Sequence, residues 1–213
     1  HAVRNTGGTM EMTRNLVADN ARAGAYLGNK SAHGTIANNL FTGSNGEIWG
    51  YSGSDVELRN NVFWKSRQAA VGFRDSCRLK LTRNSFAGNP VGIVLYSQSK
   101  VSAPAGATAE GNHYWQNAKD TENFEKEASA LSGDPLFVDA AGGDFRVAEA
   151  SPFIRADKTT VGLEKPELLL PLWQAYKSGI AVTTETEEEG GTAKASEPAS
   201  SVSTTPVNGS DSS

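Results

Sequence analysis

The sequence predicts an all-β protein, a right-handed parallel β-helix solenoid with about 22–24 residues per coil. Two periodic patterns support this prediction. An asparagine returns after intervals of 24, 22, 23 and 28 residues, at positions Asn15, Asn39, Asn61, Asn84 and Asn112. A second block, of alternating apolar residues, returns every 22 or 23 residues in the segments that begin at Gly24, Glu47, Ala70 and Gly92.

These repeats favour strands over helices. The apolar runs are short, alternate with polar residues and are separated by Gly, Asn and Ser, which is typical of strands between tight bends. A repeat of this length accommodates three short strands and three bends, but not two helices with their connections. Each coil must therefore bury its apolar face against the neighbouring coils.

The residues around each asparagine predict the core. An apolar or aromatic residue follows each one by two positions, and this column consists of Val17, Phe41, Phe63, Phe86 and Tyr114. We expect these side chains to stack inside the solenoid. Because asparagine tolerates the left-handed backbone of a tight bend, we expect the repeated asparagines to form bends and not to bind a ligand.

The chain resembles the C-terminal part of proteins of the pectate-lyase-like superfamily of right-handed parallel β-helices. The resemblance covers roughly residues 9–156 and rests on VELRNNVF, LKLTRNSF, GIVLY and the closing segment DPLFVDAAGGDFRVAEASPFI. It implies that the asparagines form an inward ladder of hydrogen-bonded amides. It implies no single activity, because this superfamily includes lyases, glycosidases, epimerases, tailspikes and proteins of unknown activity.

The chain is predicted to have four segments. Residues 1–117 form β-helix coils, residues 118–163 close the solenoid, and residues 164–182 form a strap or short helix. Residues 183–213 are rich in Thr, Ser, Glu, Gly and Pro, which predicts a disordered tail. Because residues 1–8 are short and polar and would cap an exposed first coil poorly, we expect further coils upstream.

Two segments after the coils are expected to cover part of the solenoid. Residues 119–133 combine early acidic residues with spaced apolar positions (Phe124, Ala128 and Leu131), which predicts a short helix. Residues 164–182 are apolar but interrupted by Pro166 and Pro171, which predicts a strap lying against one flank. The alternative for this strap is a partner-binding segment.

Composition narrows the class of protein. Cys77 is the only cysteine, so no intrachain disulfide forms, and a small buried thiol is expected there. No apolar run approaches the ~18 residues of a membrane span. Apart from residues 183–213, the chain is close to neutral and has no recognisable nucleic-acid module, which argues against a nucleic-acid partner. We expect a secreted, periplasmic or cell-surface protein, whose oligomeric state the sequence leaves open.

The second repeated block predicts a binding face. Alternation along a strand sends successive side chains to opposite sides of the sheet. One outward column then holds Tyr26, Trp49, Gly72 and Val94, and the next holds Gly28, Tyr51, Arg74 and Tyr96. Outward aromatic rings with polar edges suit stacking against sugar rings. The alternative is that these rings pack beneath a loop or beneath the strap.

Arg74 suggests an acidic polysaccharide as the partner, because a guanidinium pairs well with a carboxylate. In lyases that this chain resembles, basic residues or Ca²⁺ neutralise the uronate, and Lys, Arg, Tyr or His removes the C5 proton. The resemblance implies Arg74 as neutraliser or base and Tyr51 or Tyr96 as acid or base. Tyr26, Trp49, Lys65 and Arg67 are the predicted substrate contacts.

Two other classes of function stay open. A glycoside hydrolase needs two carboxyl groups about 5–9.5 Å apart, and Glu47 and Asp75 flank the predicted face at opposite edges. Any hydrolytic acids are therefore expected in coils outside this sequence. A non-catalytic surface or adhesion solenoid would need only the binding face.

No metal site or cofactor is expected, although Ca²⁺ serves some lyases of this fold. His1, His33 and His113 are scattered along the sequence, and no acidic cluster faces the predicted binding sheet. His33 is predicted to lie in the turn after the first strand of that sheet, as a solvated side chain.

Overall fold

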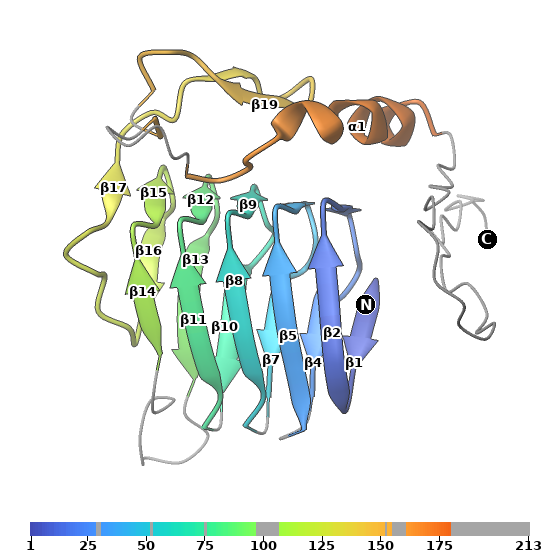
Figure 1. Cartoon of the computed structure of the whole chain (residues 1–213), viewed down its shortest axis with the longest axis vertical. Helices are drawn as coiled ribbons and strands as arrows, with labels where there is room; N and C mark the ends of the chain where they lie inside the picture. Colours follow the sequence, from blue (N-terminus) through green and yellow to red (C-terminus); the bar gives the residue numbers. More distant parts are fainter. Residues whose placement is uncertain are drawn as a thin grey trace, which may run out of the picture.

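The computed structural model describes residues 1–28, 31–51, 53–74, 76–96, 107–151, 153–154 and 161–179. In this part of the chain, parallel strands stack coil upon coil into three sheets, here named A, B and C (Figure 1). The all-β parallel solenoid is therefore confirmed. The predicted tail, residues 183–213, lies outside the described residues.

Each coil contributes strands in the order A, B, C, except that the last one contributes only β16 to sheet A and β17 to sheet C. Sheet A consists of β1 (Val3–Asn5), β4 (Ala25–Leu27), β7 (Ile48–Gly50), β10 (Ala69–Arg74), β13 (Val91–Tyr96) and β16 (Lys119–Glu122). Sheet B consists of β2 (Gly8–Thr13), β5 (Ala32–Ala37), β8 (Asp55–Arg59), β11 (Arg78–Thr82) and β14 (Thr108–Glu110). Sheet C consists of β3 (Leu16–Ala18), β6 (Leu40–Thr42), β9 (Val62–Trp64), β12 (Ser85–Ala87), β15 (His113–Trp115) and β17 (Leu131–Ser132).

A ladder of amides runs along the inside of the bend between sheets B and C. The backbone N–H and the Nδ2 of each asparagine donate to the Oδ1 of the equivalent asparagine in the next coil, at 2.8–3.0 Å. The members are Asn15, Asn39, Asn61, Asn84 and Asn112, of which all but the first are fully buried. The amides thus satisfy one another inside the core, where an unpaired polar group would be costly.

A carboxylate closes this ladder. The backbone N–H and Nδ2 of Asn112 donate to Glu127 Oε1 at 2.9 and 2.8 Å, and the Tyr114 hydroxyl donates to Glu127 Oε2 at 3.2 Å. Glu127 therefore supplies the acceptor that the next coil would have provided.

The expectation that the ladder asparagines adopt the left-handed backbone was wrong. The left-handed residue is the one before each asparagine: Arg14, Asn38, Asn60 and Arg83, with φ of 54–58°, and then Gly111 at 59°. The preceding residue turns the chain, so the asparagine itself can point its side chain inward.

A second ladder, which the sequence repeats did not reveal, lines the bend between sheets C and A. Its positions are Asn20, Ser44, Ser66, Asn89 and Asn117. The N–H and Nδ2 of Asn89 both donate to Asn117 Oδ1 at 3.0 Å, and Ser66 N–H donates to Asn89 Oδ1 at 3.0 Å. Serine replaces asparagine at two successive positions, and there the N–H of Ser44 donates to Glu47 Oε1 at 3.0 Å instead.

The predicted aromatic column forms the centre of the core. The rings of Phe41, Phe63, Phe86 and Tyr114 stack with centroid separations of 5.0–5.3 Å and interplanar angles of 7–13°. Val17 lies on the preceding coil, in register with Phe41. The expected core stack is confirmed.

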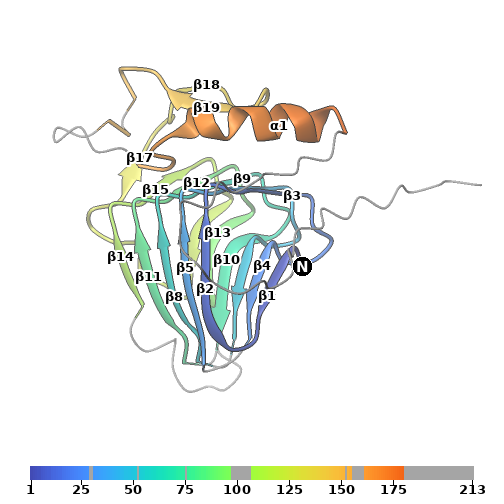
Figure 2. The same cartoon turned by 45° about the vertical axis from the view of Figure 1, so that its right-hand side comes forward.

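The end of the described chain covers sheet C. An antiparallel hairpin of β18 (Phe137–Asp139) and β19 (Asp144–Val147) is followed by η1 (Pro166–Leu168) and α1 (Leu170–Lys177). Both views show the hairpin and α1 above sheet C (Figures 1 and 2). They bury an apolar cluster of Leu40, Val62, Phe145, Leu163, Leu169 and Trp173. The predicted strap is thus a short helix on sheet C, away from the aromatic columns of sheet A.

In the described part of the chain, no helix is long and apolar enough to cross a membrane.

The helix predicted over residues 119–133 was wrong. Residues 119–122 instead pair with β13 and extend sheet A, while 131–132 pair with β15. Phe124 packs against the end of the core, and Glu127 closes the ladder. Of the spaced apolar positions, Phe124 therefore covers the last coil, Leu131 extends sheet C, and Ala128 is exposed.

Replacing Phe63 by Ala should lower the free energy of unfolding by about 3–5 kcal/mol, because the stacked neighbours cannot fill the cavity. Chemical denaturation monitored by circular dichroism would measure this. Lys80→Ala is the matched surface control, since it removes only an exposed ion pair with Glu57 (Nζ to Oε1, 3.0 Å), worth up to about 1 kcal/mol. Equal losses in the two variants would contradict the stacked core.

Replacing Glu127 by Ala should lower the free energy of unfolding by about 1–3 kcal/mol, because the two buried donors of Asn112 lose their acceptor. Glu127→Gln keeps an acceptor oxygen and should lose less. The same denaturation measurement applies, with the exposed Glu125→Ala as control. If all three variants unfolded alike, Glu127 would not close the ladder.

Candidate functional site

The two predicted outward columns lie side by side on sheet A. Tyr26 pairs in register with Trp49, which pairs with Gly72, which pairs with Val94. In the neighbouring column, Arg74 pairs with Tyr96. The side chains that alternate with these columns point into the solenoid and are buried: Leu27, Ile48, Val71, Phe73, Ile93 and Leu95. The alternation predicted from the sequence is therefore present.

Glycines let the aromatic rings lie flat on the sheet. A Cβ at Gly72 would come within 2.5–2.9 Å of the Trp49 ring, and one at Gly28 within 2.3 Å of the Tyr26 ring. Both rings therefore cover backbone that carries no side chain. Trp49 extends across Gly72 to Tyr96, where the two rings stack with centroids 5.6 Å apart and planes 17° apart.

Arg74 lies between two tyrosines. Its guanidinium carbon is 4.5 Å from the ring centroid of Tyr51 and 5.6 Å from that of Tyr96, and Nη2 donates to the Tyr51 hydroxyl at 3.5 Å. Nε is buried and has no hydrogen-bond partner among the described residues. Such contacts hold the guanidinium in place and leave donor capacity for an anion.

The face continues toward the first coil. Tyr26 contacts Tyr51 with ring centroids 5.2 Å apart, and the guanidinium of Arg4 lies 5.4 Å from the Tyr26 ring. The structure therefore brings together Tyr26, Trp49, Tyr51, Arg74 and Tyr96, which we call the aromatic face. All five are half-buried, with part of each side chain exposed.

Lys65 and Arg67, the other two predicted substrate contacts, do not lie on the aromatic face. They precede β10, whereas Arg74 ends it. Lys65 Nζ lies 4.5 Å from the ring of Trp64 on sheet C, and Arg67 Nη2 is 3.1 Å from Asp19 Oδ1. The structure places both at the bend between sheets C and A, at the other end of the strand from Arg74.

The structure also places a carboxylate beside the face that the sequence reasoning missed. Glu122, on β16, is in register with Val94. Burial, and then the charge of Glu122, raise the pKa of Tyr96. The sequence predicts that residues after 117 close the solenoid, so Glu122 is not among the predicted site residues. The signal that could have found it is that Glu122 continues the outward column of Tyr26, Trp49, Gly72 and Val94 by one coil.

Of the two carboxyls expected to flank the face, Glu47 does not lie on it. Its side chain is fully buried inside the bend between sheets C and A. Asp75 lies outside the described residues. The described part of the face thus holds one carboxylate, and Glu122 is itself paired with Lys119 Nζ at 3.3 Å.

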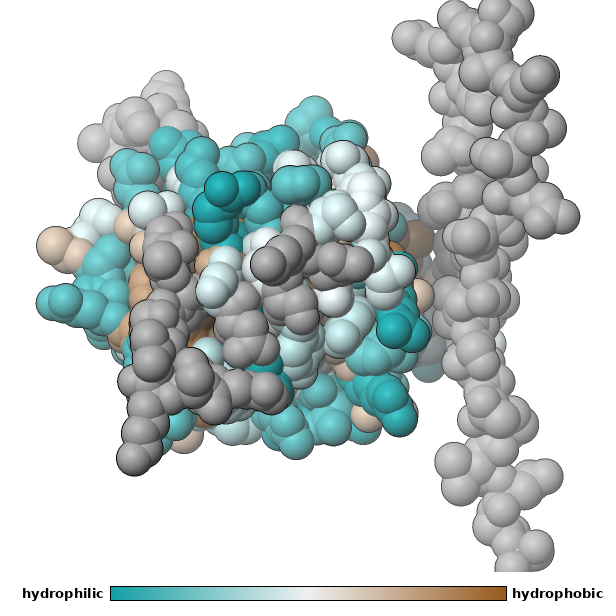
Figure 3. All heavy atoms as spheres, turned by 90° about the horizontal axis from the view of Figure 1, so that it is seen from below, coloured by the Kyte–Doolittle hydropathy of each residue, from teal (hydrophilic) through white to brown (hydrophobic). Residues whose placement is uncertain are grey.

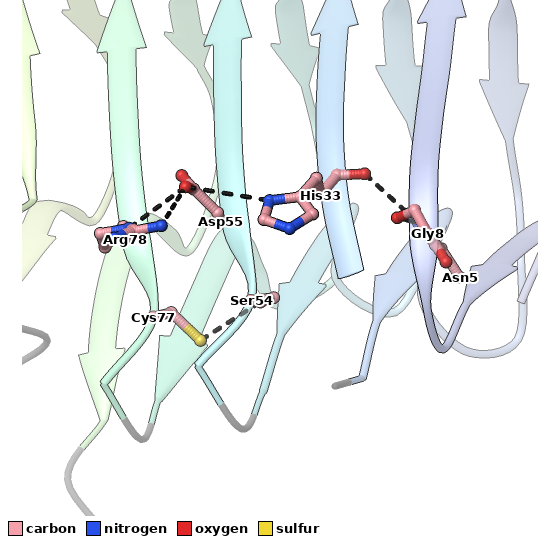
Figure 4. A network of polar contacts seen from close by, with 7 residues as sticks. All are labelled: Asn5, Gly8, His33, Ser54, Asp55, Cys77 and Arg78. Atoms are coloured by element: carbon pink, nitrogen blue, oxygen red, sulfur yellow. Dashed lines mark hydrogen bonds and ion pairs between the residues drawn. The ribbon is translucent and has the colours of Figure 1, made fainter. Parts of the chain in front are cut away.

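The surface next to the aromatic face is polar. Figure 3 views the end at which sheet A turns into sheet B, where hydrophilic residues predominate among those coloured. On sheet B, His33 lies in β5 rather than in the predicted turn, with Nδ1 3.9 Å from Asp55 Oδ2 (Figure 4). Asp55 also accepts from Arg78 Nε and Nη2 at 3.1 and 2.6 Å. The carboxylate of Asp55 and the guanidinium of Arg78 therefore pair with each other on sheet B.

A further histidine, His113, is buried inside the solenoid. His113 contacts Ser85 Oγ through Nδ1 and the carbonyl of Gly133 through Nε2, and burial lowers its pKa to about 4. It is therefore neutral at ordinary pH. Within the described ranges, no group of three His, Cys, Asp or Glu side chains is arranged to hold a metal ion.

Together, the coil-by-coil parallel sheets define a β-helix protein, and one of its sheets carries an outward aromatic and basic column. The family model for the right-handed β-helix region matches residues 2–131. The chain therefore belongs to the right-handed β-helix family. No curated protein and no solved structure matches it significantly.

Replacing Gly72 by Val should lower the free energy of unfolding by about 1–3 kcal/mol, because the new side chain would meet the Trp49 ring. In a Trp49→Ala background the same substitution should cost much less. A double-mutant cycle of denaturation free energies measures this coupling. Additive losses would show that Trp49 does not lie over Gly72.

Proposed function

We propose that the aromatic face binds an acidic polysaccharide and that the protein acts on it as a lyase-like enzyme. The observation that supports this most directly is the guanidinium of Arg74, which lies between two tyrosine rings on a partly exposed side chain. A uronate carboxylate is the planar anion that such a fork pairs with.

The rings of the face fit the rest of such a ligand. The planes of Tyr51 and Tyr96 lie 20° and 17° from the plane of Trp49, so the three rings offer surfaces of similar orientation along sheet A. Successive coils are about 4.8 Å apart, a spacing comparable with the size of a sugar ring. The sugar's apolar faces would stack on these rings, while the carboxylates pair with Arg74.

An elimination on this face would divide the roles as follows. Arg74 neutralises the uronate carboxylate, and Tyr51 beside it, in the phenolate form that this role requires, takes the C5 proton onto its oxygen. The C5–H electron pair forms the C4–C5 double bond as the C4–O bond breaks. Burial and Glu122 raise the pKa of Tyr96, so its hydroxyl holds the proton that it gives to the departing oxygen. Lys65 and Arg67 remain proposed contacts only for a ligand that extends to the opposite end of β10.

The test is to incubate the protein with matched uronic-acid and neutral polysaccharides, and to record ultraviolet absorbance of the new double bond, reducing ends and binding. Arg74→Ala should weaken binding of the uronic-acid polymers about 10–100-fold, because a charge-assisted hydrogen bond contributes about 1.5–3 kcal/mol. Neutral polymers should be affected far less. Arg59→Ala, an exposed arginine on sheet B, is the control.

Each outcome separates the candidate functions. Absorbance that is lost in Arg74→Ala supports the lyase. Reducing ends without absorbance would replace it with a hydrolase, and binding without either product would replace it with a non-catalytic surface or adhesion solenoid. Absence of binding to every polymer would refute the aromatic face as a saccharide site.

A further inference from the structure

Glu47 is a buried carboxyl that the proposed function does not use. Its side chain is fully buried, at the bend where sheet C passes into sheet A. On the adjacent coils its positions are taken by Gly24 and Ala70, which bring no charge. Burial raises the pKa of Glu47 to about 7, against weaker lowering by Ser44 and Ser66, and the nearby charge of Asp19 raises it further.

A single proton would complete the hydrogen bonding at this bend. Glu47 Oε1 accepts from Ser44 N–H at 3.0 Å. Glu47 Oε2 and Ser66 Oγ are both buried and have no well-formed hydrogen bond to a described residue, although the Ser66 hydroxyl is near enough to affect the Glu47 pKa. A protonated Oε2 can donate to Ser66 Oγ, whereas an ionised carboxylate at this place would be a buried charge without a cation.

Ser44 connects this carboxyl to its surroundings. The N–H of Ser44 donates to Glu47, and its Oγ accepts from Asn20 N–H and Nδ2 at 3.3 and 3.2 Å. The Ser44 carbonyl accepts from Arg67 N–H at 2.9 Å. Any movement of Glu47 therefore acts on the backbone of two further coils.

The same bend fastens the C-terminal helix. Asp19, the residue before Asn20, pairs with Arg67 Nη2 at 3.1 Å and accepts a hydrogen bond from the Tyr176 hydroxyl of α1. Burial, and then Asp19, raise the pKa of Tyr176 to about 12, so it remains a donor. The charged group that acts on Glu47 is thus Asp19, which together with Arg67 forms the attachment point of α1.

We propose that Glu47 holds a proton in the folded protein, and that loss of this proton loosens the bend to which α1 is fastened, making the strap a pH-sensitive latch. An ionised Glu47 repels Asp19, and this repulsion weakens the site that holds Tyr176. The latch involves no ligand of the aromatic face, so it does not rest on the proposed function.

The direction of the pH effect follows from linkage. In the closed bend the Glu47 pKa is about 7, against 4.5 for the exposed group. Between these values the closed form holds a proton that the open form releases, so rising pH favours opening. Opening should increase about tenfold per pH unit from about pH 5 to about pH 6.5 and level off above about pH 7.

Amide hydrogen exchange followed by mass spectrometry tests this on the full chain, after correction for the intrinsic pH dependence of exchange. In the wild type, exchange should rise with pH in both residues 43–47 and residues 170–177. Glu47→Gln, which resembles the protonated form, should abolish the rise in both segments. Tyr176→Phe should speed exchange of α1 at every pH, while the bend keeps its own pH dependence.

Three results would overturn the latch. The first is an unchanged pH profile in Glu47→Gln. The second is a pH-dependent bend whose opening leaves α1 unaffected in the wild type, since the two would then not be coupled. The third is loss of the profile in Glu57→Gln, a partly exposed carboxyl on sheet B that pairs with Lys80, because the effect would then not be specific to Glu47.

Discussion

The interaction on which the rest of the structure depends is the hydrogen bonding of buried amides from one coil to the next. A bend turns backbone donors away from the strand ladders, and inside a core these donors need partners. Here the partner is the Oδ1 of the asparagine one coil further along, which accepts two hydrogen bonds. Because the acceptor must lie directly over the donors, the ladder holds every coil in register with its neighbours.

That register places equivalent side chains in columns, and the columns explain both the core and the candidate site. Inside, Phe73 occupies the space above Gly50, while outside Trp49 lies over Gly72. In each case a glycine on one coil receives an aromatic ring from the adjacent coil. The aromatic face is thus built by the same stacking that builds the core, and it differs in having an arginine and partly exposed rings.

The two ladders differ in how a carboxyl enters them. Glu127 ends the first ladder by accepting from two donors of Asn112 and from the Tyr114 hydroxyl, so its charge is well satisfied. Glu47 fills a gap in the second ladder and receives one backbone hydrogen bond, so burial dominates and its proton is retained. The first arrangement closes the core, whereas the second leaves a group that titrates near neutral pH at the attachment of α1.

The sequence by itself determined the repeat, the inward and outward alternation of sheet A, and the stacked Phe column, because each follows from spacing within one coil. It also indicated which aromatic residues share a face with Arg74. Only the tertiary structure decided what lies across coils and bends. It placed Lys65 and Arg67 away from Arg74, brought Glu122 beside Tyr96, turned Glu47 inward, and laid α1 on sheet C. These placements depend on which bend a residue occupies and on long-range packing after the last coil, and no local period in the sequence encodes either.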